Sequence, residues 1–231
     1  MTAPSSPGSA AARRAPGAGR PAGPGVPLSV WAGLPVPACP PPGQPCAGPV
    51  TAEAAVRITR AFTRPGDLVA SIGSPAVSEA TAAAGRPGLG LAPSGLVRLV
   101  ACGDPGAGTA ALVITGCHEP GCCPGPAPGP GWLLYAACER VLRPGGVLAV
   151  LTPGPGSVTS DRAGGIVAAA RATGLVYAQH IVLVHAEIDG DRLDPAEPTP
   201  AGPAGDTRIH SDLLVFTKPG KPVSPQGDLR P

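Results

Sequence analysis

Aromatic and charged side chains are both scarce in this sequence. Aromatic residues make up 3% and charged residues 14% of the 231 residues, and the formal net charge is only +2. Surfaces that bind nucleic acids usually combine a clear excess of Lys and Arg with rings that stack on bases. The rings that could stack in this way are Trp31, Trp132 and Tyr135. Composition therefore gives no support for a nucleic-acid partner and leaves the substrate open.

Long apolar runs are missing as well. Arg13, Arg14 and Arg20 stand in a stretch without acidic residues, but the apolar run that an export signal requires does not follow them. The longest apolar runs, such as residues 147–151, have the length of a strand and are far too short for a membrane span. The sequence predicts a cytoplasmic protein without a membrane partner, and it leaves the oligomeric state open.

The seven cysteines are an odd number without secretory context, which favours thiols over a disulfide framework. Four candidate zinc ligands lie close together in the chain: Cys117, His118, Cys122 and Cys123. Their spacing lacks the paired C-x2-C geometry of common structural zinc sites, although Cys39 and Cys46 could join them in space. His180 and His185 are five apart in a predicted strand, so they point to opposite faces. We therefore predict no metal site.

Glycine and proline are abundant, at 34 residues each, and they cluster in stretches without periodicity. Residues 1–27 cannot bury enough apolar surface to offset the entropy lost on ordering, so we predict a disordered arm. A disordered tail is predicted for residues 220–231. Residues 28–219 are predicted to form one domain, in which the Pro-rich stretch 35–49 is loop or extended chain because proline removes amide donors.

Within that domain, helical spacing of apolar residues alternates with short apolar or β-branched runs. Predicted helices are one capped by Thr51 and running to Phe62, and those at 77–84, 132–141 and 161–172. Predicted strands are 68–72, 89–91, 96–101, 110–115, 147–152, 177–187 and 209–218. The chain is too short for eight βα units. This alternation predicts an α/β three-layer sandwich with a mostly parallel sheet of about seven strands.

Several short motifs occur in this order of elements: SVWA at 29–32, PGDLV at 65–69, AALVIT at 110–115, VLRPGG at 141–146 and HSDLLVFTKP at 210–219. Together they resemble the bacterial amino-methylating DNA methylases, which act on N4 of cytosine or N6 of adenine. The resemblance covers roughly Val30 to Pro219 and implies a Rossmann-like class I methyltransferase fold, S-adenosylmethionine as cofactor and nucleic acid as partner. In VLRPGG, the Pro-Gly-Gly turn ends a helix and admits a positive φ before a central strand.

The resemblance also implies a cofactor loop after the PGDLV strand, and Ser71, Gly73 and Ser74 stand there. Asp104 follows a later strand, where related enzymes place an acidic residue near the adenine.

The family's loop has the pattern acidic-Pro-Phe-x-Gly-x-Gly-Thr. The loop of this chain departs from it, because it keeps only one of the two glycines. Pro75 removes an amide donor, and Val77 adds a branched side chain where the backbone should approach the ligand. The segment Gly90-Leu91-Ala92-Pro93 offers no carboxylate for the ribose hydroxyls.

The catalytic loop of the family, Ser-Pro-Pro-Tyr or Asn-Pro-Pro-Tyr, is replaced here by Thr115, Gly116, Cys117, His118 and Glu119. One interpretation gives the last three residues a new acid/base or nucleophilic role at the carboxyl edge of the sheet. The other gives this loop no chemistry. The sequence thus leaves two functions open. One is a methyltransferase acting on nitrogen, and the other is a non-catalytic binding or scaffold module on the same fold.

Overall fold

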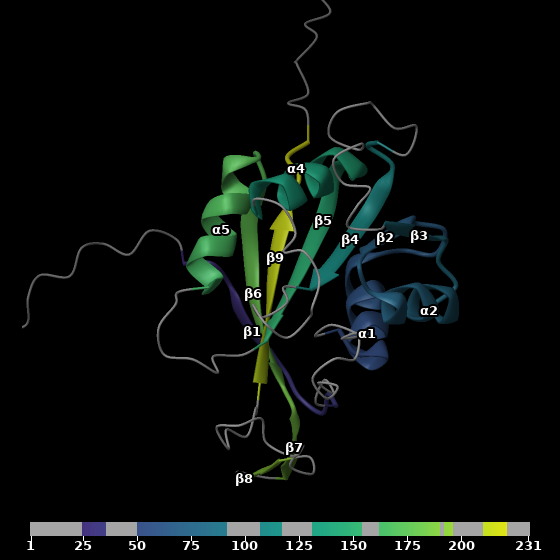
Figure 1. The fold of residues 1–231 in the computed structure, drawn as a ribbon. Helices are drawn as coiled ribbons and strands as arrows, with labels where there is room; N and C mark the ends of the chain where they lie inside the picture. The colour runs from purple at the N-terminus through teal and green to yellow at the C-terminus, as the bar shows by residue number, and fades with distance from the viewer. Residues whose placement is uncertain are drawn as a thin grey trace, which may run out of the picture.

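The computed structural model describes residues 25–35, 50–91, 107–116, 131–153, 162–189, 192–195 and 210–220. Nearly all of the predicted arm and tail, and the predicted strand 96–101, lie outside these ranges. Within the described residues, seven strands form one sheet in the order β1-β6-β9-β5-β4-β2-β3 (Figure 1). The strands are β1 Leu28–Trp31, β2 Val69–Ile72, β3 Gly88–Leu91, β4 Ala110–Gly116, β5 Leu142–Pro153, β6 Val176–Val184 and β9 His210–Thr217.

All neighbouring strands are parallel except β9, which runs antiparallel to both β5 and β6. The helices are α1 Ala52–Phe62, α2 Pro75–Ala83, α4 Gly131–Val141 and α5 Arg162–Ala172. A separate hairpin pairs β7 (Ala186–Asp189) with β8 (Arg192–Pro195). The predicted α/β fold with a mostly parallel, seven-stranded sheet is confirmed.

The sheet separates two apolar clusters, which makes the molecule three-layered. On one face, α1 and α2 pack on the sheet through residues such as Ile58 and Val77. On the other face, α4 and α5 pack through residues such as Val141 and Ile166. The two clusters meet in β9, where consecutive residues face opposite layers, so the central strands are covered on both faces.

Helix α1 forms where the sequence predicts it. The Thr51 hydroxyl caps it by accepting a hydrogen bond from the Ala54 amide at 3.2 Å. Ala55 and Ile58 are fully buried against the sheet. The helix ends at Phe62, before the turn at Pro65-Gly66 that the sequence identifies.

Three predicted boundaries are wrong. Strand β5 begins at Leu142 instead of Val147, because Leu142 already pairs with Ala110 of β4, so the Pro-Gly-Gly segment expected before the strand lies within it. Helix α2 begins at Pro75 instead of Val77, because proline suits the first helical position, where its fixed φ is already helical and no amide partner is needed. The predicted strand 177–187 is broken at His185. The ring of His185 is buried there, with Nε2 2.8 Å from the Ser211 hydroxyl and Nδ1 3.3 Å from the Leu34 carbonyl. The chain then leaves the main sheet and forms β7.

Motifs that are distant in the chain meet at the amino ends of the parallel strands. Asp67 of PGDLV pairs with Arg143 of VLRPGG at 3.0 Å, and it accepts a hydrogen bond from the Arg64 amide at 2.8 Å. That amide and the charge of Arg143 lower the pKa of Asp67. These contacts hold the starts of β2 and β5 together.

The end of β9 is fastened to the same edge. Lys218 exchanges backbone hydrogen bonds with Gly145 and Gly146, each 2.9 Å long. Its ammonium group contacts the carbonyl of Glu139 at 2.7 Å and the carboxylate at 2.9 Å. Gly145 has the expected positive φ, +76°. At Gly146, a Cβ would lie 2.8 Å from the carbonyl oxygen of Arg143, so no larger residue fits. The VLRPGG motif and the FTKP segment at 216–219 therefore support the fold at the amino ends of the parallel strands, opposite their carboxyl ends.

Candidate functional site

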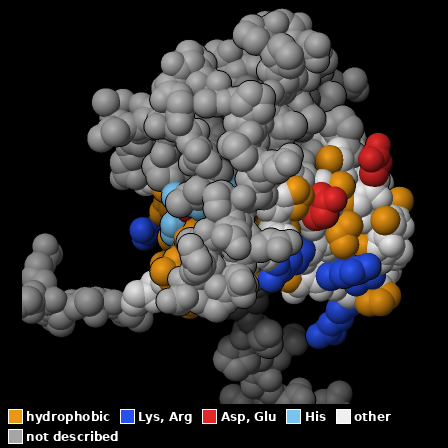
Figure 2. All heavy atoms as spheres, turned by 90° about the horizontal axis from the view of Figure 1, so that it is seen from below, with side chains coloured by type: hydrophobic (Ala, Val, Ile, Leu, Met, Phe, Trp, Pro, Cys, Tyr) orange, Lys and Arg blue, Asp and Glu red, His pale blue; other side chains and the backbone are white. Residues whose placement is uncertain are grey.

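The direction in which strands are added to the sheet reverses between β2 and β4. From β2 the chain continues to β3 on one side, whereas β4 lies on the other side of β2 and is followed outward by β5. In open α/β sheets, the crevice outside the carboxyl ends of the strands at such a reversal is where ligands bind. Because Ile72 of β2 is in register with Thr115 of β4, the loops that follow these two strands begin side by side. Figure 2 views the molecule from this side, from below in Figure 1.

The structure brings two of the predicted site segments together at this reversal. Ser71, Gly73 and Ser74 lie at the end of β2, and Thr115 and Gly116 end the adjacent β4. The remaining candidates, Cys117, His118, Glu119 and Asp104, lie outside the described residues, so their roles stay predictions.

Gly73 makes the sharp turn from β2 into α2. Its φ is +70°, a conformation that L side chains rarely adopt, and its amide donates to the Leu91 carbonyl at 3.2 Å. The turn is thereby tied to the end of β3 as well as β2. Ser74 follows in extended conformation as the cap residue of α2. The amino end of α2, where amides lack helical partners, therefore faces the crevice.

The structure places both residues that sequence analysis singled out as changes to this loop. Val77 is fully buried, in the cluster that α1 and α2 form against the sheet. Pro75 does remove one amide, but it occupies the first helical position. The amides of Ala76 and Val77 remain at the amino end of the helix. The altered loop thus keeps some of the backbone amides that can donate hydrogen bonds to a ligand.

The two serines of the loop differ in their environment. Ser71 points toward α2, and its hydroxyl oxygen lies 3.3 Å from that of Ser78. Ser71 therefore contributes to the packing of β2 against α2. Ser74 is 6% exposed, and within the described part of the chain its buried hydroxyl has no hydrogen-bond partner and caps no amide. Ser74 is the loop residue with unused hydrogen-bonding capacity.

Thr115 is 2% exposed and shares the face of Val113, which packs against α4 and α5. Its side chain therefore lies under the crevice rather than in it. Gly116 is half-buried at the last position of β4.

Sequence reasoning missed an ionisable pair on the neighbouring strands. Nε2 of His180 on β6 lies 3.0 Å from Oδ1 of Asp212 on β9. Burial and, to a smaller extent, the charge of Asp212 raise the pKa of Tyr177. The pair depends on the register of two antiparallel strands, which no local pattern in the sequence reveals.

Other candidate chemistry is limited in the part of the chain that the structure describes. No group of three or more His, Cys, Asp or Glu side chains there could hold a metal ion. Cys138 is the one cysteine described, and complete burial raises the pKa of its thiol to about 12. No described helix has the length and apolar character needed to cross a membrane.

Comparisons with known proteins give similarity to solved methyltransferases. No family model matches the sequence, and no curated protein matches it. A TehB-like SAM-dependent methyltransferase from Corynebacterium glutamicum is 15% identical, with a TM-score of 0.43 over 73% of this chain and 88% of that chain. Geranyl diphosphate C-methyltransferase from Streptomyces coelicolor is 12% identical, with a TM-score of 0.41 over 72% and 80%.

Phosphoethanolamine N-methyltransferase 2 from Haemonchus contortus is 14% identical, with a TM-score of 0.42 over 72% of this chain. This chain spans 52% of that protein. The α/β fold of this chain is established by its sheet order and its two helical layers.

Proposed function

We propose that this chain is a methyltransferase-type domain that binds S-adenosylmethionine at the carboxyl edge between β2 and β4. The observation that carries the proposal is the reversal of strand order there, with a positive-φ glycine turn leading into the amino end of α2. The order of motifs in the sequence supports the choice of cofactor.

The residues present fit the amino-acid end of this cofactor. The amino end of a helix favours a carboxylate because its unpaired amides donate and the helix dipole is positive there. Gly73 lets the backbone turn close to such a group, and the buried Ser74 hydroxyl supplies a donor that this chain does not otherwise use. We therefore assign Gly73, Ser74 and the amides of Ala76 and Val77 as the residues that would hold it. Asp104 remains the candidate for the adenine.

When bound, S-adenosylmethionine would supply an electrophilic methyl group for transfer to a nitrogen acceptor. The chain's contribution is to hold the acceptor beside the end of β4. Gly116 and the predicted residues Cys117, His118 and Glu119 are the candidates for that contact. A DNA acceptor, with nucleic acid as partner, follows from the sequence resemblance alone, because the net charge of +2 and 3% aromatic content do not favour it.

A second candidate is a binding module on the same fold without transferase activity. It is favoured by the absence of any acidic residue between Glu79 and Asp104 in the sequence. The sequence that follows β3, which ends at Leu91, therefore supplies no carboxylate for ribose hydroxyls.

Isothermal titration of the full chain with S-adenosylmethionine and S-adenosylhomocysteine tests the proposal. We expect a micromolar Kd, roughly −8 kcal/mol. Gly73→Ala should weaken binding by about tenfold, because a Cβ at positive φ distorts the turn at the ligand.

Gly85→Ala is the matched control. Gly85 has φ +67° at the opposite end of α2, and a Cβ there would meet nothing within 4 Å, so it carries similar backbone strain away from the site. Absence of heat at millimolar ligand, together with an unshifted Tm, would refute cofactor binding. Binding without release of S-adenosylhomocysteine across a panel of amine acceptors would favour the non-catalytic module.

A further inference from the structure

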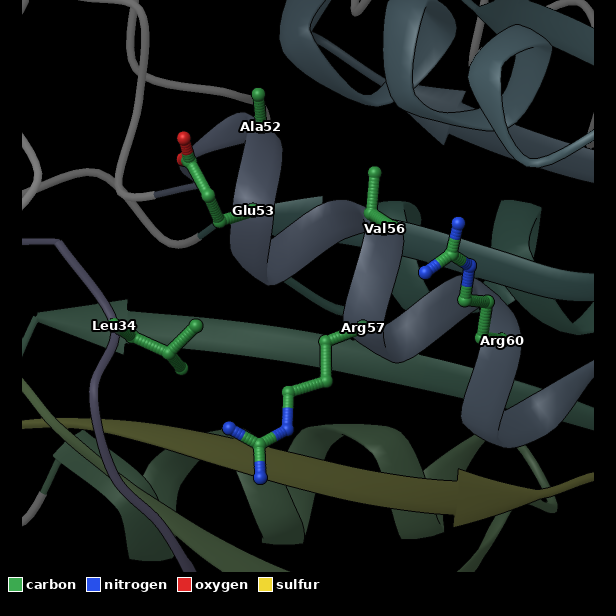
Figure 3. Close-up of a pocket in the computed structure, with 6 residues that line it drawn as sticks. All are labelled: Leu34, Ala52, Glu53, Val56, Arg57 and Arg60. Atoms are coloured by element: carbon green, nitrogen blue, oxygen red, sulfur yellow. The ribbon is translucent and has the colours of Figure 1, made fainter.

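A cavity of about 490 Å³ lies on the outer side of α1, away from the residues assigned to the cofactor. Its lining residues are Leu34, Ala52, Glu53, Val56, Arg57 and Arg60 (Figure 3). Leu34 comes from the segment after β1, and the other five residues belong to the first two and a half turns of α1. This volume lies in the range of pockets that bind small molecules.

Arg57 is held in a fixed orientation at this cavity. One of its terminal nitrogens donates to the Ala32 carbonyl at 3.0 Å, and the guanidinium carbon lies 4.8 Å from the ring centre of Trp31. Trp31 in turn stacks on Phe62, with ring centres 6.4 Å apart. A guanidinium group has five N–H donors, so most of those of Arg57 remain for a ligand. A ligand that binds them loses little side-chain entropy of Arg57, because the group is already ordered.

Arg60 provides a second cationic group at a different point of the cavity. It is exposed, and no hydrogen bond or ion pair holds it within the described residues. Figure 3 shows the guanidinium groups of Arg57 and Arg60 extending to opposite sides of α1, with Val56 beside Arg60. The two arginines therefore present two separate anion-binding points.

The local charge favours an anion at both points. Among the described lining residues there are two guanidinium groups and one carboxylate, that of Glu53, which Figure 3 shows at the first turn of α1, away from both cationic groups. Leu34 is buried and Val56 is partly buried, and they add apolar surface to the lining.

We infer that this cavity binds a small organic molecule that carries two or more phosphate groups. Each arginine offers a planar pair of N–H donors that matches phosphate oxygens. The apolar body of the ligand lies on Val56 and Leu34, and two phosphates are required because the arginines are separated. The inference does not depend on the proposed cofactor, because the cavity shares no residue with the loop at Gly73.

Titration of the full chain with inorganic triphosphate and with inorganic phosphate, at low salt, tests the inference. Triphosphate should bind at least tenfold more tightly than phosphate, because only the longer anion can engage both arginines. Arg60→Gln should lower the affinity for triphosphate to about that for phosphate. Glu53→Gln, which removes the carboxylate among the described lining residues, should raise the affinity for triphosphate.

Arg171→Gln is the matched control, because Arg171 is an exposed arginine in the last turn of α5, on the other face of the sheet. It should leave triphosphate affinity unchanged, and circular dichroism should show that all variants are folded. Equal losses in Arg60→Gln and Arg171→Gln would overturn the inference, since binding would then reflect overall charge. A short single-stranded oligonucleotide that displaces triphosphate with higher affinity would also overturn it, in favour of a polymer-binding surface.

Discussion

Two hydroxyl residues stand at equivalent places, one before each helix of the same layer, but only one of them caps its helix. Thr51 accepts a hydrogen bond from the Ala54 amide, whereas the buried Ser74 hydroxyl caps no amide of α2. Burying a hydroxyl without a partner costs about 1–3 kcal/mol. A group kept at that cost is expected to matter for something other than folding, which agrees with the role proposed for Ser74 in holding a ligand.

Substituting the two residues separately distinguishes these roles. Thr51→Ala should lower the free energy of unfolding by about 1 kcal/mol, as loss of an N-cap usually does. Ser74→Ala should leave it unchanged or raise it by up to about 1–3 kcal/mol, because a buried hydroxyl without a partner is removed and no capping bond is lost, while weakening binding of S-adenosylhomocysteine. Urea denaturation and calorimetric titration measure the two effects. A loss of stability in Ser74→Ala as large as in Thr51→Ala would show that its hydroxyl supports the fold.

At the residue scale, the sequence predicts what depends on near neighbours. The Thr51 cap and the positive φ of Gly145 follow from a few adjacent residues, and both are confirmed. The direction of Val77 could not be predicted, since it depends on which side of α2 meets the sheet. The contact of His180 with Asp212 joins residues 32 positions apart and follows from strand register.

At the scale of elements, helices and strands were predictable where their patterns are periodic and their ends carry local signals. Thus α1 and β4 appear within a residue or so of their predicted bounds. The break between β6 and β7 was missed, because it follows from contacts of the His185 ring with Leu34 and Ser211, which come from other parts of the chain.

The link between the starts of β2 and β5 should depend on pH through Asp67. Its folded-state pKa is lowered, so its stabilising effect is present above the ordinary carboxyl pKa and is lost as pH falls through the folded-state value. Asp67→Asn should therefore destabilise the protein at pH 7, by less than about 1 kcal/mol because Arg143 is half exposed.

The difference in urea midpoint between wild type and Asp67→Asn should shrink steadily between pH 4 and pH 2. Glu79→Gln, at an exposed position of α2, is the charge-matched control and should show no such trend. A difference that grows toward low pH would contradict the assigned role of Asp67.

At the scale of the whole molecule, one sheet carries two cores of similar size. Leu213 and Leu214 are consecutive in β9, both are completely buried, and they belong to opposite layers. Leu213→Ala and Leu214→Ala should each lower the free energy of unfolding by about 2–5 kcal/mol. Urea unfolding followed by circular dichroism should remain a single transition in both. A near-neutral result for either variant would mean that its layer contributes little to stability.

The overall fold was more predictable than the site, because the motifs that indicate the fold and the residues of the candidate site lie at different edges of the sheet. The motifs with the clearest resemblance, PGDLV, VLRPGG and FTKP, meet at the amino ends of the parallel strands, where Asp67, Arg143 and Lys218 join them. The candidate site lies at the opposite edge, where the loop keeps Gly73 but departs from the family pattern at Pro75 and Val77. Sequence likeness at the first edge gives no information about chemistry at the second.

The position of β1 also sets the order in which the protein can fold as it is synthesised. Strands β2 to β5 are complete once residue 153 has been made, but β1 pairs only with β6, and the contact of Ser29 with Gln179 spans 150 positions. At usual rates of translation, β1 must wait roughly 10–30 s for its partner. During that time the backbone N–H and C=O groups of β1 have no partner strand, so the nascent chain is open to chaperone binding or mispairing until β6 emerges.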